Sequence, residues 1–477
     1  MIALSDKRKH ELSLTLLFAA FHFLWVTVLV PTTRAGEGWL STRQMEMVYY
    51  TQQLVLISGM LAYAGLSGLA ENGRFRRSCS PAAGALFFIG VAVLLTADKG
   101  TPFYLAVSAA VSLCLGALLA AVYRRMSLET AAGAATARCL GCGSALAIAL
   151  QYLLQSRWGQ SPLLPVGMLA AFGWVAYMLL SSPVEAPASD ENAAPGTVRG
   201  VRLLIPCLVS VLFLFFIDCY NEHIVYLYTQ SGFTANDPYQ WPRLAVIPCY
   251  LLFAAIGDKR DGRLVPVASL CIALTATLNS VLAGYRGAYW VNMCLFYCAV
   301  AATINYYTLV FWRLAPRTRR PALWASMGRI LDCVMVLVTG GVRLGTLPPA
   351  VILGMDIAGV ALIILMMALG GDLNLSTSTA MEAPPAPAEA PPAPLPPAEL
   401  SPEETLERMR DRYDLTRREA EVLRELVLTE DKQSVISERL SIQVKTLQDY
   451  VTRLYRKTGA ATRAGLTDLY HENRRQL

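Results

Sequence analysis

Apolar residues occur in long runs through the first 371 residues, and the runs form two groups of six with a polar stretch at 183–200 between them. Each run approaches the roughly 20 residues that an α-helix needs to cross a bilayer. The runs lie at 12–30, 48–70, 80–97, 102–123, 135–155, 162–182, 203–221, 244–257, 264–284, 289–312, 322–342 and 349–371. The pattern predicts an all-α, polytopic membrane bundle of about 12 spans, with six-helix halves in residues 1–182 and 203–371.

Shorter helices with one apolar face are predicted after residue 401. Thr416 and Glu419 have the spacing of a capping box, which predicts the start of a helix. Apolar residues then recur at helical spacing in three short segments, so each segment has a face to bury. The predicted core positions are Ala420, Leu423, Leu426 and Val427, then Ile436 and Leu440, and then Leu447, Val451, Leu454 and Tyr455. We expect three helices with a shared core, the third of which begins near Val444.

The third of these helices keeps a polar face after its core positions are removed. This face consists of Lys445, Thr446, Gln448, Asp449, Thr452, Arg453 and Arg456, with Lys457 and Arg463 nearby. Short polar side chains can read base edges in a DNA groove, while Lys and Arg neutralise phosphates. The alternative is an ordinary solvated helix face, because residues 401–477 hold 15 Lys and Arg against 14 Asp and Glu.

The order of residues in this region resembles the LuxR-type helix-turn-helix domain of bacterial transcription regulators. The matching residues are Leu415, Thr416, Arg418, Glu419, Glu421, Val422 and Leu423, then Ile436, Leu440 and Ile442, and then Thr446, Leu447, Val451, Leu454, Tyr455, Lys457, Gly459, Thr462 and Arg463. The chain departs from the usual residues of the family at Glu430, Gln448 and Tyr450, where Gly, Lys and His are common.

The resemblance implies that the third helix enters the major groove of double-stranded DNA. The positions that would face bases are Gln448, Asp449 and Thr452, and those near phosphates are Lys445, Thr446 and Arg453. Domains of this kind usually act as homodimers on two-fold half-sites, and we expect the last helix, about Arg463 to Tyr470, to provide the contact.

Composition agrees with a membrane protein, because hydrophobic residues make up 55%, charged residues 16%, and the mean hydropathy is +0.42. With a cytoplasmic N-terminus, 17 Lys and Arg of the loops fall inside and seven outside. Those inside are Lys7, Arg8, Lys9, Arg74, Arg76, Arg77, Arg124, Arg125, Arg199, Arg202, Lys259, Arg260, Arg263, Arg313, Arg317, Arg319 and Arg320. The positive-inside rule therefore predicts a multi-pass protein of the bacterial inner membrane with both termini in the cytoplasm. A cleaved signal peptide is the alternative for the first run, but the run is too long and lacks a small-residue cleavage site.

Two loops at corresponding places in the halves share a theme. Residues 68–77 and 257–263 each combine acidic residues with Gly-Arg. Both resemble the loop that major facilitator transporters carry between the second and third helices of each half. Together with the six-plus-six pattern, they lead us to expect a major-facilitator-like bundle of two pseudo-repeats.

Charged residues inside predicted spans are candidates for ligand binding, because they are costly in a bilayer. The candidate ligand-binding residues are Arg138, Asp218, Glu222, Arg329 and Asp332. Arg329 and Asp332 lie three residues apart on one helix face, so an ion pair between them is the simpler alternative. Cys139 and Cys142 form one C-x-x-C without a second pair or nearby His, so we expect no metal and no cofactor. No residue pattern indicates catalysis.

A proline-rich linker is predicted at 372–400, since eight prolines fall between Pro384 and Pro397. Such a segment favours extended polyproline II at about 3.1 Å per residue and would span up to roughly 90 Å. Ser401 and Glu404 then have the spacing of a second capping box, which predicts renewed helical structure at the start of the domain 401–477.

The sequence as a whole predicts a membrane-tethered, one-component transcription regulator. Residues 1–371 would sense a membrane signal or an unidentified small molecule, bound from outside or within the lipid bilayer, and residues 401–477 would bind DNA. The alternative is a major-facilitator-type transporter with a C-terminal regulatory or interaction domain. A degenerate transporter that serves only as an anchor is a third reading.

Overall fold

The computed structural model describes residues 6–33, 35, 39–70, 73–157, 163–181, 201–229, 241–262, 264–282, 289–342, 347–369, 401–429, 431 and 433–475. Every regular element in these ranges is helical, which confirms the all-α prediction. The chain divides into two units, Met1–Ala380 and Met381–Leu477, and the division falls inside the predicted linker. The predicted hinge at 183–200, the linker at 372–400 and Glu430 lie outside the described residues.

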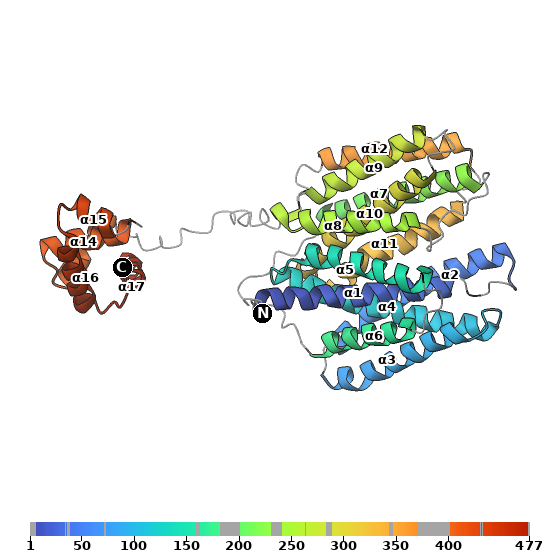
Figure 1. The fold of residues 1–477 in the computed structure, drawn as a ribbon, viewed down its shortest axis with the longest axis horizontal. Coiled ribbons are helices and arrows are strands. Elements are labelled where there is room, and N and C mark those ends of the chain that lie inside the picture. The colour runs from blue at the N-terminus through green and yellow to red at the C-terminus, as the bar shows by residue number, and fades with distance from the viewer. Residues whose placement is uncertain are drawn as a thin grey trace, which may run out of the picture. The chain divides into compact units, whose positions relative to one another are not determined.

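The first unit is a bundle of long helices that run side by side (Figure 1). Its first half contains α1 (Asp6–Thr33), α2 (Thr42–Ala70), α3 (Gly73–Thr96), α4 (Pro102–Ala131), α5 (Thr136–Gln151), η1 (Tyr152–Arg157) and α6 (Leu163–Ser181). Its second half contains α7 (Val201–Thr229), η2 (Trp241–Ala245), α8 (Val246–Ile256), η3 (Lys259–Gly262), α9 (Leu264–Leu282), α10 (Tyr289–Leu314), η5 (Ala315–Arg317), α11 (Pro321–Val342) and α12 (Pro349–Leu369).

Among the described residues, seven helices are long and apolar enough to cross a membrane. They are Lys7–Leu29, Pro102–Ala131, Thr136–Gln155, Leu163–Leu180, Leu204–Glu222, Trp290–Arg317 and Pro321–Val342. Shorter apolar helices occur at Gly84–Thr96, Trp241–Ile256, Leu264–Asn279 and Ala350–Met366. Several long apolar helices are compatible with a membrane protein, and the count of 12 spans stays a prediction.

The two halves of this unit pack their helices in the same pattern. In the first half, α1 contacts α5 and α6, while α4 contacts α2 and α3. In the second half, α7 contacts α11 and α12, while α10 contacts α8 and α9. Each of these four contacts of the first half therefore has a counterpart six helices later. The halves meet where α5 contacts α8 and where α2 contacts α11.

The contact between α5 and α8 depends on the absence of a side chain at Gly141. A Cβ atom at this position would lie 2.3 Å from the carbonyl oxygen of Tyr250 on α8. Glycine permits this close approach of backbone to backbone because it carries no Cβ. The backbones of α5 and α8, and so of the two halves, are consequently in direct contact at this position.

The connection between α2 and α3 is shorter than the loop expected at 68–77. Helix α2 continues to Ala70 and α3 begins at Gly73, so most of the expected loop is helical. Arginine and phenylalanine do not break a helix, and short connections suffice between neighbouring antiparallel helices. The basic residues Arg74, Arg76 and Arg77 thus belong to the first turns of α3.

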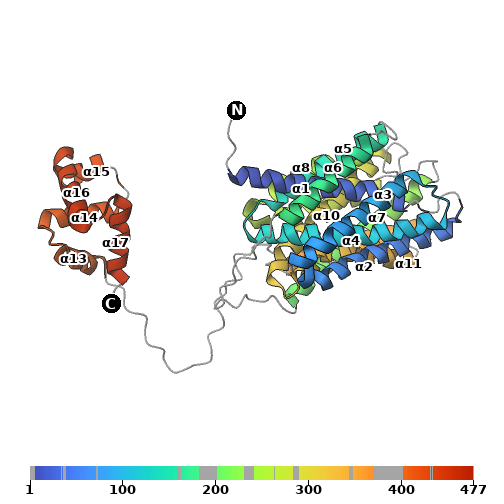
Figure 2. The same ribbon diagram turned by 90° about the horizontal axis from the view of Figure 1, so that it is seen from below.

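The second unit contains five helices in the described residues (Figure 2). They are α13 (Pro402–Arg412), α14 (Arg417–Leu428), α15 (Gln433–Arg439), α16 (Val444–Thr458) and α17 (Arg463–Arg475). Both expected capping boxes are present. Ser401 Oγ accepts from Glu404 N–H at 3.3 Å and Thr416 Oγ1 from Glu419 N–H at 3.4 Å. Each glutamate accepts in return from the backbone N–H of its cap residue at 2.8 Å. Hence α13 and α14 begin where the sequence predicts.

This unit has a core of its own, which all five helices or the turns beside them supply. The buried apolar residues are Leu406, Met409, Leu415, Val422, Leu423, Leu426, Ile436, Leu447, Val451, Leu454, Leu466 and Tyr470. Helix α17 packs against α13 and α14. Its apolar side chains Leu466 and Tyr470 are therefore used inside the domain, and the expected dimer contact through the last helix stays a prediction.

Candidate functional site

Helix α16 is held by sharp backbone turns at both ends. Ser441, in the turn that joins α15 to α16, has a φ of +52°. Gly459, which ends α16, has a φ of +76°, and its N–H donates to the carbonyl oxygen of Tyr455 at 2.9 Å. A left-handed residue at this place is the usual way to terminate a helix. The helix thus has defined ends.

The rotation of α16 buries Leu447, Val451 and Leu454 and exposes its polar face. All seven candidate DNA-binding residues are exposed, namely Lys445, Thr446, Gln448, Asp449, Thr452, Arg453 and Arg456. We call these seven residues the α16 polar face. The structure therefore brings them together on one accessible surface.

Two contacts shape the α16 polar face. The Arg453 guanidinium lies over the ring of Tyr450, 5.6 Å from its centroid. Thr452 Oγ1 donates to the carbonyl oxygen of Gln448 at 2.8 Å. Because this bond uses the hydroxyl hydrogen of Thr452, its oxygen lone pairs and its methyl group remain for an external partner.

Lys457 does not belong to this face, although the sequence placed it nearby. Its Nζ donates to Glu419 Oε2 at 2.8 Å and to the carbonyl oxygen of Asp414 at 2.7 Å. Burial of the Glu419 carboxyl opposes its ionisation, but hydrogen bonds from Lys457 and Thr416 outweigh burial and lower the pKa of Glu419. Lys457 therefore joins α16 to the start of α14.

Arg463 is likewise part of the domain's framework. Its Nε donates to the carbonyl oxygen of Leu426 at 2.8 Å and its Nη1 to that of Asp431 at 2.6 Å. Its Nη2 donates to the carbonyl oxygen of Thr429. These acceptors lie at and just after the last turn of α14, where carbonyl groups lack partners within the helix. Arg463 thus closes the C-terminal end of α14.

In the first unit, Arg329 and Asp332 form the ion pair that was the simpler alternative. Arg329 Nη1 lies 2.5 Å from Asp332 Oδ2. The guanidinium also lies 5.1 Å from the ring centroid of Trp25 on α1 and 5.8 Å from that of Tyr307 on α10. Its Nε has no hydrogen-bond partner within the described part of the chain. Arg329 therefore sits between aromatic rings from both halves.

Asp218 lies on α7, which contacts the helix of Arg329. Thr339 Oγ1 of α11 donates to Asp218 Oδ2 at 3.0 Å. Glu222 lies one turn further along α7. The structure thus places Asp218, Glu222, Arg329 and Asp332 on two contacting helices.

Arg138 is separate from that group. It lies in the first turn of α5, its side chain is 59% exposed, and its Nη1 is 3.4 Å from Glu11 Oε2 on α1. The carboxylate of Asp258 accepts from the backbone N–H of Ala137 at 3.0 Å and from that of Arg138 at 2.8 Å. Asp258 of the second half thereby caps α5 of the first half, and Arg138 lies at the end of the bundle rather than within it.

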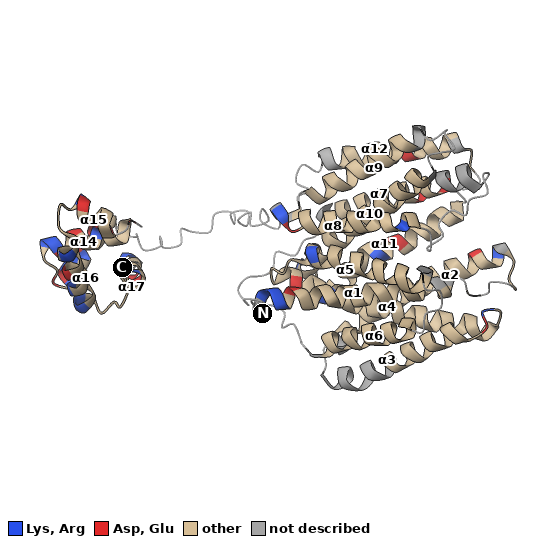
Figure 3. Ribbon diagram, in the orientation of Figure 1, with Lys and Arg blue, Asp and Glu red and all other residues tan. Residues whose placement is uncertain are grey.

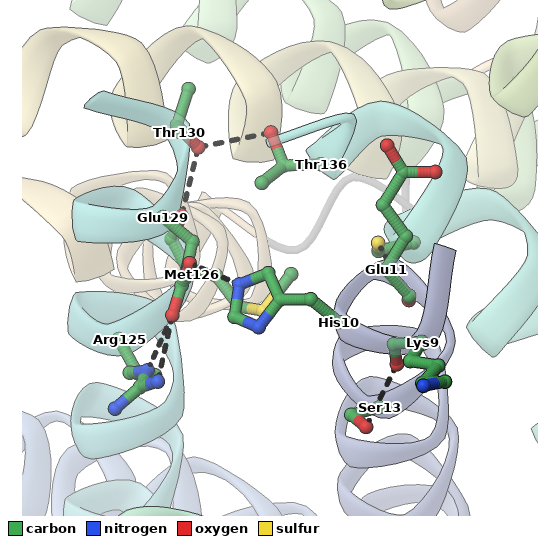
Figure 4. A network of polar contacts seen from close by, with 10 residues as sticks. Lys9, His10, Glu11, Ser13, Arg125, Met126, Glu129, Thr130 and Thr136 are labelled. Carbon is green, nitrogen blue, oxygen red and sulfur yellow. Dashed lines mark hydrogen bonds and ion pairs between the residues drawn. The ribbon is translucent and has the colours of Figure 1, made fainter. Parts of the chain in front are cut away.

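A second polar network lies between α1 and α4 (Figure 4). His10 Nε2 of α1 is 2.8 Å from Glu129 Oε2 of α4. The other oxygen of Glu129 lies 2.7 Å from Arg125 Nη2 and 2.9 Å from its Nε. The Glu129 side chain is 6% exposed. This network ties α1 to α4 near the first turns of α1.

Several residues of these groups gave no signal in the sequence. Trp25 and Tyr307 lie in apolar runs, where they look like ordinary membrane-facing aromatics. Thr339 is one of many hydroxyl residues in the spans. Asp258 had a signal, because it stands in the loop 257–263 that resembles a major facilitator loop, but its partner helix could not be read from sequence.

Metal-ligating residues and comparisons with known proteins give no further indication of function. No group of three metal-ligating side chains occurs in the described ranges. Cys139 and Cys142 are both free thiols. No protein-family model matches the sequence, and comparison with curated proteins gives no match.

Proposed function

We propose that the chain is a membrane-tethered, one-component transcription regulator. Its second unit is a LuxR-type helix-turn-helix domain in which α15 and α16 form the helix-turn-helix. Its first unit is a 12-span, major-facilitator-like sensor bundle in the bacterial inner membrane, with both termini in the cytoplasm. The observation that carries the proposal is the α16 polar face, on which every candidate DNA-binding side chain is exposed.

The dimensions and chemistry of α16 support DNA binding. Its 15 residues make a rod of about 22 Å at 1.5 Å per residue, and the major groove admits an α-helix. Gln448, Asp449 and Thr452 carry the donors and acceptors that base edges require. Lys445 and Arg453 supply positive charge for phosphates. Specific binding through this face is the function that its composition fits best.

Dimerisation of the domain on two half-sites has to use surfaces other than the buried face of α17. The exposed residues of that helix include Ala464, Asp468 and His471. They offer a small polar contact, which alone would be weak. We infer that DNA and the membrane bundle contribute to pairing, since two tethered domains are held at high local concentration.

Sensing is proposed to use the two halves of the bundle. Their repeated packing pattern supports the pseudo-repeat of a major-facilitator-like fold. Arg329 contacts aromatic rings from both halves. A ligand with an anionic group could replace Asp332 as its partner. Such a ligand shifts the bundle only if it binds one arrangement of the halves better than another.

The proposal is tested with purified residues 401–477 and DNA fragments from around the chain's own locus, over a salt series. We expect sequence-specific binding that weakens steeply with salt. Lys445→Ala should lower affinity for all sequences and reduce the salt slope, while Thr452→Ala should change sequence preference. Arg417→Ala is the matched control, because Arg417 is an exposed cation on α14, with 94% of its side chain accessible.

Absence of specific binding, even when two copies of the domain are joined artificially, would refute the regulator proposal. The second candidate is then a transporter with a C-terminal regulatory domain. The repeated packing of the halves and the acidic residues Asp218 and Glu222 favour it. Uptake or efflux by residues 1–371 in proteoliposomes is its test. Absence of flux for every class of solute would leave the third alternative, a degenerate transporter that serves only as an anchor.

A further inference from the structure

A pocket of about 810 Å³ opens at the end of the first unit where α1 begins. The first half contributes the first turns of α1, the corner between α4 and α5, and the start of α5. The second half contributes Asp258, the end of α10 and η5. The volume lies within the range of small-molecule sites, roughly 300–1,000 Å³. Any occupant of this pocket would contact both halves at once.

The pocket is lined by more positive than negative side chains. Its cationic residues are Lys7, Arg8, Arg138, Arg313 and Arg317. Its acidic residues are Glu11 and Asp258, so five positive charges face two negative ones. Figure 3 shows Lys and Arg at the start of α1 and at the start of α5, both at this end of the bundle.

Both acidic residues already have partners from the first half. Asp258 accepts two backbone N–H groups at the start of α5, at 3.0 and 2.8 Å. Glu11 lies 3.4 Å from Arg138 at its nearest approach. Arg138 is nevertheless 59% exposed, and Lys7 and Arg8 are exposed on α1. Cationic groups therefore remain accessible from the pocket.

We propose that this pocket binds a phosphate-bearing anion, which links the two halves at this end. Guanidinium groups match phosphate oxygens with paired hydrogen bonds, and their charge does not titrate away. Four arginines and a lysine from four separate helices suit a ligand with several anionic oxygens better than a single carboxylate. The side-chain hydroxyls of Thr130 and Thr136 also line the pocket wall, where Thr130 donates to the carbonyl oxygen of Met126 at 2.8 Å and accepts from Thr136 at 2.9 Å.

Two sources share this chemistry. One is a free phosphorylated small molecule, and the other is the phosphate headgroup of an anionic phospholipid. Basic residues at the predicted cytoplasmic face are attracted to anionic lipids of that leaflet. In either case the anion offsets repulsion among cations of α1, α5, α10 and η5, and so favours the arrangement in which the halves are close at this end.

The pocket is a site other than the group around Arg329, and anion binding there does not depend on DNA binding. The anion assay contains no DNA, while the test of the DNA-binding domain contains no bundle. Failure of one proposal is thus distinguishable from failure of the other.

The test uses the full-length chain in nanodiscs of phosphatidylcholine. In the first arm, pyrophosphate is titrated and its binding is measured by calorimetry. In the second arm, phosphatidylglycerol replaces part of the lipid, and the shift in the thermal unfolding midpoint is measured. Both arms compare the wild type with the double variant Arg8→Gln/Arg138→Gln and with Glu11→Gln. The matched control is Arg43→Gln, because Arg43 is exposed at the start of α2 and does not line the pocket.

For a free ligand, we expect the double variant to weaken pyrophosphate binding at least tenfold, since a charge-assisted hydrogen bond contributes about that factor. Glu11→Gln should strengthen binding severalfold because it removes a negative charge, and Arg43→Gln should leave it unchanged. Because a damaged fold would not bind pyrophosphate more strongly, the higher affinity of Glu11→Gln separates an effect of charge in the pocket from general damage to the fold.

For a lipid headgroup, pyrophosphate does not bind, and phosphatidylglycerol raises the midpoint of the wild type more than that of the double variant. This outcome supports the pocket and assigns its source. The proposal is overturned if neither pyrophosphate nor phosphatidylglycerol has an effect, or if their effects are the same in wild type, double variant and Glu11→Gln.

Discussion

Replacement of Arg463 by glutamine tests whether this residue holds the second unit together. The guanidinium donates to three carbonyl oxygens at the end of α14, those of Leu426, Thr429 and Asp431. Glutamine is shorter and neutral, so it cannot reach all three. The variant therefore leaves the end of α14 without its partners, while the α16 polar face is untouched.

The size of the effect follows from these bonds. A hydrogen bond from a charged donor contributes about 1.5–3 kcal/mol to stability. Three such bonds would contribute about 4.5–9 kcal/mol if they were independent and shielded from water. Arg463 is only partly buried, and water can replace it at the carbonyls. We therefore expect a loss of about 2–4 kcal/mol. A single small core supplies about 3–5 kcal/mol in total, so the variant should be close to unfolded.

The assay is urea denaturation of residues 401–477 followed by circular dichroism. With a slope of about 1 kcal/mol per molar urea, the midpoint should fall by about 2 M or more. The midpoint of Arg463→Lys should lie between those of the wild type and Arg463→Gln, because the single amine of Lys replaces only part of the rigid fork of guanidinium donors. Arg456→Gln is the matched control, since Arg456 is exposed on α16 and such changes usually stay within about 0.5 kcal/mol.

The opposite pattern would refute this reasoning. If Arg463→Gln unfolds within about 0.5 kcal/mol of the wild type yet loses DNA affinity, Arg463 is a DNA contact, as its place near the third helix first suggested. If Arg456→Gln destabilises the domain instead, the rotation assigned to α16 is wrong.

Three further predictions concern stability. Because the pKa of Glu419 is lowered in the folded domain, its contribution to stability is present above the ordinary value of 4.5 and is lost as pH falls below it. Glu419→Gln should therefore flatten the acid side of the profile of stability against pH, measured by denaturation. An unchanged profile would contradict this. Gly141→Ala should lower the melting temperature of the full chain in detergent, because its Cβ would lie 2.3 Å from the Tyr250 oxygen, whereas Gly173→Ala, with no atom within 4 Å, should not; equal effects would count against the close packing of the halves. Asp258→Ala should cost about 0.5–2 kcal/mol, as loss of a helix cap does, and an unshifted melting temperature would argue against that cap.

Features that depend on near neighbours were predictable from the sequence. The capping box of Thr416 and Glu419 involves residues three apart, and the structure confirms it. The core positions Leu447, Val451 and Leu454 follow from helical spacing, and all three are buried. The exposure of the α16 polar face is the complement of that spacing. The pairing of Arg329 with Asp332 was likewise one of two readings that their spacing allowed.

Features that depend on distant partners were decided by tertiary structure alone. Lys457 meets Glu419 across 38 residues of sequence, and this contact removes it from the polar face. Asp258, 120 residues away, caps the helix whose first turn holds Arg138 at the end of the bundle. A sequence lists charges but not their partners, and a cation has the same signature whether it contacts a carboxylate, a row of carbonyls or an external phosphate. Only the fold, by bringing helices of both halves to one end, determines which cations of this chain are engaged and which line a common pocket.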